Sequence, residues 1–240
     1  VNALDLAERF QTPVFFLSDI DIGMNDWMID ELTWDSSYVP DRGKVLSAEQ
    51  VDELDNFYRY LDVDGDHIPY RTLPGTNPKG AYFLRGSGHN KYGRYTEKGE
   101  EYKEIVDRLY AKWQSAANAV PQPIVTPAKT KARYGIIAIG SSDGAVTEAR
   151  DRLEADGIAL DYMRIRGFPF SQEVDEFIAA HDEIFVVEQN RDAQLLDLLV
   201  AETSVPKEKL VPVLHYSGEP LNYRFVYDSM QIALKVRKIA

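Results

Sequence analysis

The stretch YGIIAIGSSDGAVTEA, residues 134–149, decides the fold. Residues 134–139 form a continuous apolar run, which is typical of a strand buried on both faces of a sheet. Gly140 follows this run, and residues 143–156 have the amphipathic pattern of a helix. We therefore predict a buried strand that leads through a tight turn into a helix, which is the first half of an α/β unit.

The same alternation continues to the end of the chain. We predict buried strands at residues 160–165, 184–187 and 210–214, separated by helices at residues 171–181, 193–201 and 223–238. Apolar strands that alternate with amphipathic helices predict a parallel, doubly wound sheet with helices on both faces. We therefore expect this half of the chain to be a mostly parallel α/β domain.

The N-terminal half is patterned less regularly. Residues 3–10 place apolar side chains on one helical face, and the run VFFL at residues 14–17 predicts a buried strand. No strand precedes this pair, so we expect the matching part of the unit to lie upstream or on another chain. We also predict a short helix at residues 47–60, with a capping box formed by Ser47 and Gln50. A longer helix is predicted at residues 95–118.

Composition and charge restrict the function. The 240-residue chain has no cysteine, so we expect neither disulfides nor thiolate-bound zinc or iron–sulfur clusters within it. Its formal net charge of −12 disfavours nucleic acid and anionic membranes as partners. Its apolar runs are shorter than the roughly 18–20 residues that span a bilayer. We expect a soluble protein of the reducing cytoplasm.

Several short motifs resemble known binding patterns only in part. IGSSDGAVTEA, residues 139–149, lacks the glycine and lysine spacing of nucleotide-binding loops, which favours a tight turn. DVDGDH, residues 62–67, begins like a calcium loop but has His67 and Leu73 where glycine and glutamate are needed, which favours a structural turn. The four histidines lack zinc-site spacing, so no metal site is predicted. The polar end of VVEQN, residues 186–190, either caps the next helix or lines a subunit contact, and we favour the contact.

Residues 69–97 differ from the rest of the chain in charge. They hold five basic residues and one acid, whereas residues 19–66 hold 14 acids and three bases. Arginine and imidazole side chains suit carboxylate and phosphate groups. Two interpretations stay open: the polar side chains converge on an anion, or the glycines and tyrosines make a tightly packed loop. The candidates for anion binding are Arg71, Arg85, His89, Asn90 and Arg94.

Three separated motifs together resemble a known family. They are LAERFQTPVFFLSDIDIGMN at residues 6–25, DVDGDHIPYRTLPGTNPKGAYFLRGSGHN at residues 62–90, and GIIAIGSSDGAVTEA at residues 135–149 followed by FVVEQN. In this order they look like the α subunit of 2-oxoacid:ferredoxin oxidoreductases, in particular the 2-oxoglutarate type. The resemblance covers essentially the whole chain.

The resemblance implies an α/β chain with several parts. Residues 1–26 would be the end of a pyrimidine-binding domain for thiamine diphosphate. Residues 27–118 would be an irregular connecting segment with an interface loop and a helix, and residues 119–130, which carry three prolines, a linker. Residues 131–240 would form a doubly wound, transketolase C-terminal-like domain with a mostly parallel sheet.

The resemblance also implies a function. Enzymes of this family use thiamine diphosphate with magnesium and a 4Fe-4S cluster to convert 2-oxoglutarate and coenzyme A reversibly into succinyl-CoA, carbon dioxide and reduced ferredoxin. A β subunit and the upstream part of the α subunit would hold these cofactors, and this segment would hold none alone. The main catalytic motifs are expected upstream, so the segment alone is expected to be inactive. The candidates for a substrate pocket or interface are Asp66, Arg71, Arg85, His89 and Asn90.

Two alternatives remain open. A subunit of a pyruvate or branched-chain 2-oxoacid:ferredoxin oxidoreductase would share the same architecture. A non-catalytic interaction module would instead use the acidic residues 19–66 to bind a basic partner. Sequence upstream of Val1 would separate these possibilities.

Overall fold

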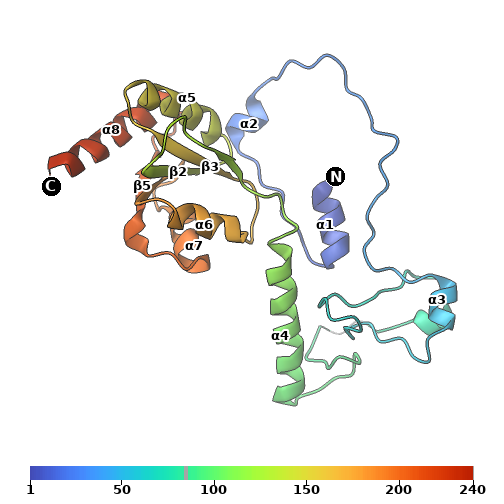
Figure 1. Ribbon diagram of the computed structural model, residues 1–240. Helices are drawn as coiled ribbons and strands as arrows, with labels where there is room; N and C mark the ends of the chain where they lie inside the picture. The colour runs from blue at the N-terminus through green and yellow to red at the C-terminus, as the bar shows by residue number, and fades with distance from the viewer. Residues whose placement is uncertain (84–85, 240) are drawn as a thin grey trace. The chain divides into compact units, whose positions relative to one another are not determined.

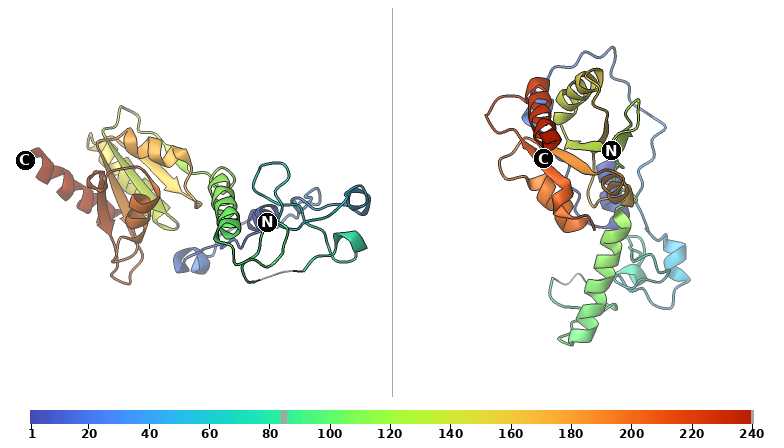
Figure 2. Two further views of the ribbon diagram at one scale, coloured as in Figure 1. Left: turned by 90° about the horizontal axis from the view of Figure 1, so that it is seen from below. Right: turned by 60° about the vertical axis from the view of Figure 1, so that its left-hand side comes forward.

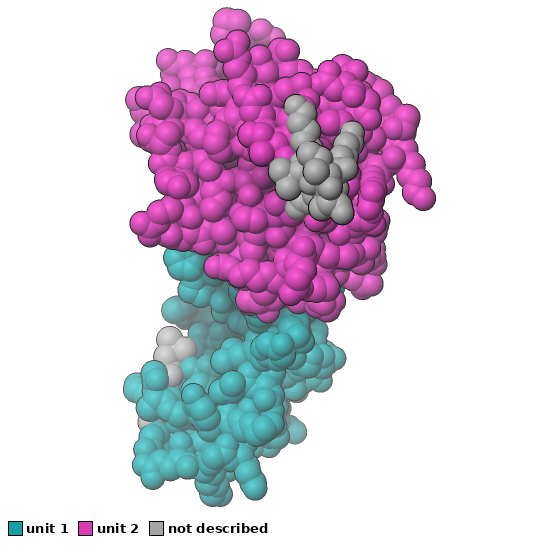
Figure 3. All heavy atoms as spheres, turned by 90° about the vertical axis from the view of Figure 1, so that its left-hand side faces the viewer, with its two compact units in different colours: residues 1–16, 31–119 teal, residues 17–30, 120–240 magenta. Residues whose placement is uncertain are grey.

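The computed structural model describes residues 1–83 and 86–239 (Figure 1). The chain forms two compact units. Unit 1 contains residues 1–16 and 31–119, and unit 2 contains residues 17–30 and 120–240, as coloured in Figure 3.

Unit 2 is built on a five-stranded sheet with the strand order β1-β3-β2-β4-β5. The strands β2, β3, β4 and β5 are parallel, and only β1 runs antiparallel to its neighbour β3. The predicted α/β class with a mostly parallel sheet is therefore confirmed. The strand bounds are β1 Ile124–Thr126, β2 Tyr134–Ile139, β3 Leu160–Ile165, β4 Glu183–Glu188 and β5 Leu210–Leu214.

Helices cover both faces of this sheet, as an apolar parallel sheet requires. Ile136 and Ala138 of β2 belong to a core that includes α5 and α8, whereas Ile137 packs with α6 and α7 on the opposite face. In Figure 1, α5 and α8 lie above the sheet and α6 and α7 below it. The helix bounds are α5 Ser142–Ala155, α6 Gln172–Ala179, α7 Gln194–Glu202 and α8 Tyr223–Ile239, with a short 3-10 helix η2 at Lys207–Lys209.

The predicted linker contains a strand. β1 lies between Pro123 and Pro127, within residues 119–130. It pairs with β3 alone and is therefore an edge strand, the position in a sheet that tolerates neighbouring prolines. The prolines thus flank an edge strand of the sheet. From Val120 onward, the residues predicted as a linker belong to unit 2.

Unit 1 contains little regular structure. Its small apolar core joins Leu6 and Phe10 of α1 to Ile68 and to Ala116 of α4. α4 is the long, straight helix of this unit (Figure 2). The short helix α3 has the expected capping box between Ser47 and Gln50, but it ends at Asp52. The bounds are α1 Asn2–Phe10, α3 Ala48–Asp52, η1 Pro78–Gly80 and α4 Gly99–Ala116.

The predicted strand at residues 14–17 does not form. Phe15, Phe16 and Leu17 are each more than 80% exposed, and this run pairs with no strand among the described residues. A strand needs a neighbour to satisfy its backbone N–H and C=O groups, and the described part of the chain provides none here. The described residues therefore leave this apolar run exposed, and the prediction of a strand at residues 14–17 is wrong.

A further helix, α2, follows this run at Ile20–Met24 and belongs to unit 2. Among the described residues, none of the helices combines the length and apolar character that crossing a membrane requires.

Candidate functional site

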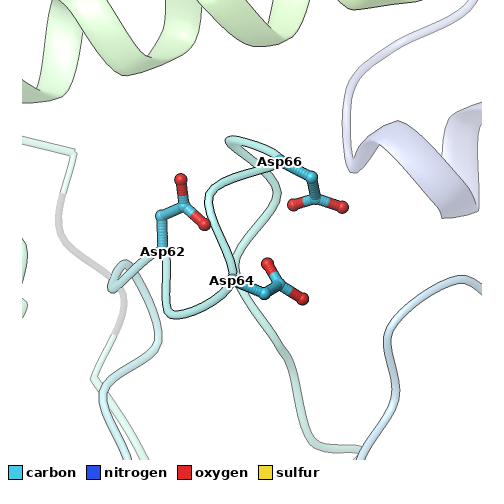
Figure 4. A group of neighbouring side chains, drawn as sticks. All are labelled: Asp62, Asp64 and Asp66. Atoms are coloured by element: carbon cyan, nitrogen blue, oxygen red, sulfur yellow. The ribbon is translucent and has the colours of Figure 1, made fainter.

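The acidic loop at residues 62–66 is held by its own backbone and by one lysine. The carboxylate oxygens of Asp62, Asp64 and Asp66 lie within 4.8 Å of one another (Figure 4). The Lys44 Nζ donates to Asp64 at 2.7 Å and lies 2.6 Å from an oxygen of Asp66. Burial acts to lower the pKa of Lys44, but the hydrogen bonds to these two carboxylates outweigh it and raise the pKa. One ammonium group therefore contacts two of the three carboxylates.

Asp62 shapes the turn that follows it. Its carboxylate accepts hydrogen bonds from the backbone N–H of Gly65 at 2.9 Å and of His67 at 3.0 Å. His67 has a φ of 70°, a left-handed conformation that glycine adopts more easily. These contacts agree with the structural turn that the sequence favours.

Arg71 is committed to a different neighbour. Its guanidinium pairs with Glu8 of α1 and donates to the backbone oxygen of Arg42 at 2.9 Å. Its backbone also pairs with Lys44 and Leu46. Arg71 therefore links the basic segment to α1 and to residues 42–46, all within unit 1.

His89 and Asn90 belong to a separate group in unit 1. The His89 ring stacks on Tyr60 with 3.9 Å between ring centroids. The Asn90 side chain accepts from the backbone N–H of Tyr92 and Arg94, each at 3.1 Å, and donates to Glu101 of α4. Asn90 thus closes a turn and fastens it to α4.

The predicted candidates therefore do not form one cluster. Within the described residues, no contact joins Arg71 to His89 or Asn90, and Asp66 is paired with Lys44. Arg85 lies outside the described residues. For the residues that can be placed, the contacts favour the interpretation of a tightly packed loop, while their role in a complete enzyme stays a prediction.

A second polar group lies at the carboxyl end of β2 in unit 2. The Asp19 carboxylate accepts from the Ser141 N–H at 3.0 Å and from the Ile22 N–H at 2.9 Å. Burial acts to raise the pKa of Asp19, but these N–H donors outweigh it and hold the pKa below its usual value. A Cβ on Gly140, which has a φ of 62°, would come within 2.9 Å of the same carboxylate. The start of α5 is therefore occupied by a side chain of the protein itself.

Glu188 at the end of β4 caps α7. This carboxylate is 2% exposed and accepts from the backbone N–H of Leu195 at 2.6 Å and of Leu196 at 3.0 Å. Asn190 donates to it at 2.7 Å. Capping, the alternative that we did not favour, accounts for Glu188. Ala193, the residue at the N-cap position of α7, has no polar side chain that could accept hydrogen bonds from the start of the helix.

The residues of this chain do not fit the cofactors of the resembled family. The sequence has no cysteine to supply thiolates for an iron–sulfur cluster. The strand-to-helix turn at Ser141 presents its N–H to the Asp19 carboxylate, which would repel a diphosphate group.

Comparison with known proteins gives the chain a functional context. No family model matches the chain. It is 27% identical, over 100% of its length, to the α subunit of 2-oxoacid:ferredoxin oxidoreductase 2 from Aeropyrum pernix, and covers 36% of that subunit. It is also 27% identical over 225 residues, 91% of its length, to the 2-oxoacid:ferredoxin oxidoreductase α subunit from Saccharolobus solfataricus, covering 34% of it. The chain thus spans about a third of these relatives.

A solved structure has the same fold. The 2-oxoglutarate:ferredoxin oxidoreductase from Magnetococcus marinus, determined with 2-oxoglutarate, coenzyme A and succinyl-CoA bound, matches 95% of this chain and 38% of its own with a TM-score of 0.73. The sequence identity is 24%, so this match speaks for the fold. Over its whole length, the chain is similar to α subunits of 2-oxoacid:ferredoxin oxidoreductases.

Proposed function

We propose that this sequence is part of the α subunit of a thiamine-diphosphate-dependent 2-oxoacid:ferredoxin oxidoreductase. The observation that carries the proposal is the similarity to α subunits of that name along 100% of the chain. The reaction is the oxidative decarboxylation of a 2-oxoacid, with coenzyme A as acyl acceptor and ferredoxin as electron acceptor. We further propose 2-oxoglutarate as the substrate, because the motifs of the chain resemble that type.

The proposal assigns roles to the parts of the chain. Residues 1–26 are the end of the pyrimidine-binding domain, residues 27–118 connect it to the next domain, and residues 131–240 form the transketolase C-terminal-like domain. A β subunit and further α-subunit sequence hold thiamine diphosphate, magnesium and the 4Fe-4S cluster. This chain has no cysteine for the cluster, and its turn at Ser141 faces a carboxylate.

Exposed apolar side chains at residues 15–28 support a role inside a larger assembly. Phe15, Phe16 and Leu17 are 84%, 83% and 85% exposed, and Met28 is fully exposed. Burying one such side chain is worth about 1.5–3 kcal/mol, so a surface of this kind favours association with further protein. The alternative, a non-catalytic interaction module, also predicts that another protein covers these apolar side chains, but it predicts no enzymatic activity.

The test uses the complete α subunit that contains this sequence, produced anaerobically with its β subunit. We expect thiamine-diphosphate-dependent and coenzyme A-dependent reduction of a viologen dye, with kcat/KM for 2-oxoglutarate at least about tenfold above that for pyruvate or a branched-chain 2-oxoacid. Omission of coenzyme A and omission of the 2-oxoacid are the controls.

The outcomes separate the two levels of the proposal. If pyruvate were preferred, the substrate would be corrected and the family proposal retained. If no 2-oxoacid supported reduction by a complex that contains its cofactors, the enzyme proposal would be wrong.

A further inference from the structure

His181 lies just past the end of α6 and is buried in unit 2. Its side chain is 4% exposed. The Nδ1 atom lies 2.7 Å from the backbone oxygen of Phe177, and the Nε2 atom lies 3.0 Å from Oδ2 of Asp161, the second residue of β3. The ring therefore bridges the last turn of a helix and the start of a strand.

Both of these oxygens are hydrogen-bond acceptors. A backbone carbonyl carries no proton, and an ionised carboxylate carries none either. The Asp161 carboxylate also accepts the backbone N–H of Ala128 through Oδ1 at 2.7 Å. Both ring nitrogens of His181 must then donate, and only the doubly protonated imidazolium has two N–H groups.

The other three histidines have contacts that a neutral ring can satisfy. For His215 the partner is a serine hydroxyl, which can donate as well as accept. For His89 one ring nitrogen faces a backbone oxygen, so one N–H is enough. The Nδ1 of His67 lies 3.5 Å from a carboxylate oxygen, but this side chain is 41% exposed, so water can satisfy the ring. All four histidines lie in the described part of the chain, and His181 is the one that needs two protons to keep its contacts.

The end of α6 also favours a cation at this position. The backbone N–H of His181 donates to Ile178 at 3.4 Å, so the ring takes the place of a backbone donor for the Phe177 oxygen. The Lys209 Nζ donates to the backbone oxygens of Ala179 at 3.2 Å and of His181 at 2.8 Å. These oxygens form the negative end of the helix dipole, where a positive charge on either side chain is stabilising.

Charged groups on the neighbouring elements act on the ring with both signs. Asp161 from β3 favours a positive charge, and so does Asp182, which directly follows the histidine. Lys209 from η2 and Arg133, which is paired with Asp182, oppose it. Of these four side chains, Asp161 is the one that is hydrogen-bonded to the His181 ring.

We propose that the folded protein holds His181 as an imidazolium at neutral pH, and that this proton fastens the segment after β1 to the sheet. Ala128 lies in this segment, and Asp161 joins it to α6 through the ring. When the ring loses a proton, a nitrogen lone pair faces one of the two oxygens, so one contact breaks. The carboxylate that accepts the Ala128 N–H then loses its fixed position.

The fastened segment lies in the stretch of chain that leads from α4 of unit 1 to the parallel strands of unit 2. The pair of His181 and Asp161 is thus a pH-sensitive attachment for this connection. It has this property whether or not the proposed enzyme function is correct.

The test follows the ring protons of the full 240-residue chain in two-bond proton–nitrogen correlation spectra. Asp161→Asn is the informative variant. Its amide oxygen can accept the Ala128 N–H and its amide nitrogen can donate to Nε2 of His181, so a neutral ring satisfies every contact. Asp182→Asn is the matched control: it makes the same change in charge beside the histidine, at a carboxylate that accepts from Arg133. Circular dichroism checks that both variants fold.

We expect both ring nitrogens of His181 to carry protons at about pH 7 in the parent protein and in Asp182→Asn, and only one of them in Asp161→Asn. One protonated ring nitrogen in the parent protein at that pH would overturn the proposal. This spectrum alone decides if Asp161→Asn fails to fold.

Urea unfolding and amide hydrogen exchange test the consequence for the segment. A proton bound in the folded state stabilises it at low pH, and this stability is lost as the pH rises. Between about pH 6 and about pH 8.5, the unfolding equilibrium constant should therefore rise about tenfold more in the parent protein than in Asp161→Asn. Exchange of the Ala128 amide, corrected for its intrinsic rate, should quicken over this range in the parent protein only. An equal pH dependence in the two proteins would contradict the fastening role.

Discussion

At the scale of single residues, the buried carboxylate of Glu188 replaces a helix cap. It takes the two N–H groups at the start of α7 and the amide of Asn190. Glu188→Ala should therefore destabilise unit 2 by about 2 kcal/mol, since it leaves two buried N–H groups without acceptors. The midpoint of urea unfolding, followed by far-ultraviolet circular dichroism, measures the loss. Glu202→Ala, an exposed glutamate at the end of the same helix, is the control and should change the midpoint little.

From the sequence, helix capping is the less favoured of two interpretations for residues 186–190, which include Glu188. Sequence rules look for a capping side chain immediately before the helix, and that position holds Ala193 with a φ of 52°. The actual cap lies seven residues before Leu195, on the preceding strand. The same holds for Asp19, which occupies the start of α5 from 122 residues away. Only the folded chain brings such acceptors to the helix ends.

At the scale of elements, two glycines of one strand–helix unit have opposite requirements. Gly135 in β2 is buried, and a Cβ there would lie 2.6 Å from the Cδ1 of Ile184 and 3.0 Å from the Phe177 ring. A Cβ added at Gly144 in α5 would meet no atom of the described residues within 4 Å. The strand therefore requires glycine for packing, whereas the helix does not.

We expect Gly135→Val to destabilise the protein by about 1–3 kcal/mol through overpacking. Gly144→Ala should stabilise it by about 0.5–1 kcal/mol, because alanine loses less backbone entropy in a helix. Thermal unfolding of both variants beside the parent protein measures the two shifts. A neutral result for Gly135→Val would mean that Phe177 and Ile184 can move apart without cost.

Most elements of unit 2 follow from local patterns. The strands at residues 134–139, 160–165 and 210–214 form with the bounds that the apolar runs predict. The wrong predictions concern segments whose structure depends on a neighbouring strand. β1, predicted as part of a linker, forms a strand because it pairs with β3. Residues 14–17, predicted as a strand, stay unpaired because the described part of the chain offers them no strand to pair with. The periodicity of apolar residues indicates which face of a helix or strand is buried, but it does not indicate which other element packs against that face.

At the scale of the whole molecule, the apolar cores are separate. Both clusters that cover the sheet draw only on residues 134–234, and the core of unit 1 joins α1 to Ile68 and Ala116. We therefore expect a fragment of residues 120–240 to unfold cooperatively on its own, measured by circular dichroism on heating. A fragment of residues 31–119 is the counterpart: without Leu6 and Phe10 it should lose its cooperative transition. A non-cooperative melt of the first fragment would show that the sheet depends on unit 1.

The positions of the tryptophan side chains determine which structural changes tryptophan fluorescence can detect in this protein. Its three tryptophans are Trp27, Trp34 and Trp113, and residues 120–240 contain none. Trp27, within residues 15–28, is 76% exposed, and Trp34, just beyond them, is 81% exposed. The tryptophan fluorescence emission should therefore be red-shifted, and it should change little when the sheet of unit 2 unfolds. Because Trp27 and Trp34 are exposed, a blue shift of the tryptophan emission would show that another surface has covered the segment around them.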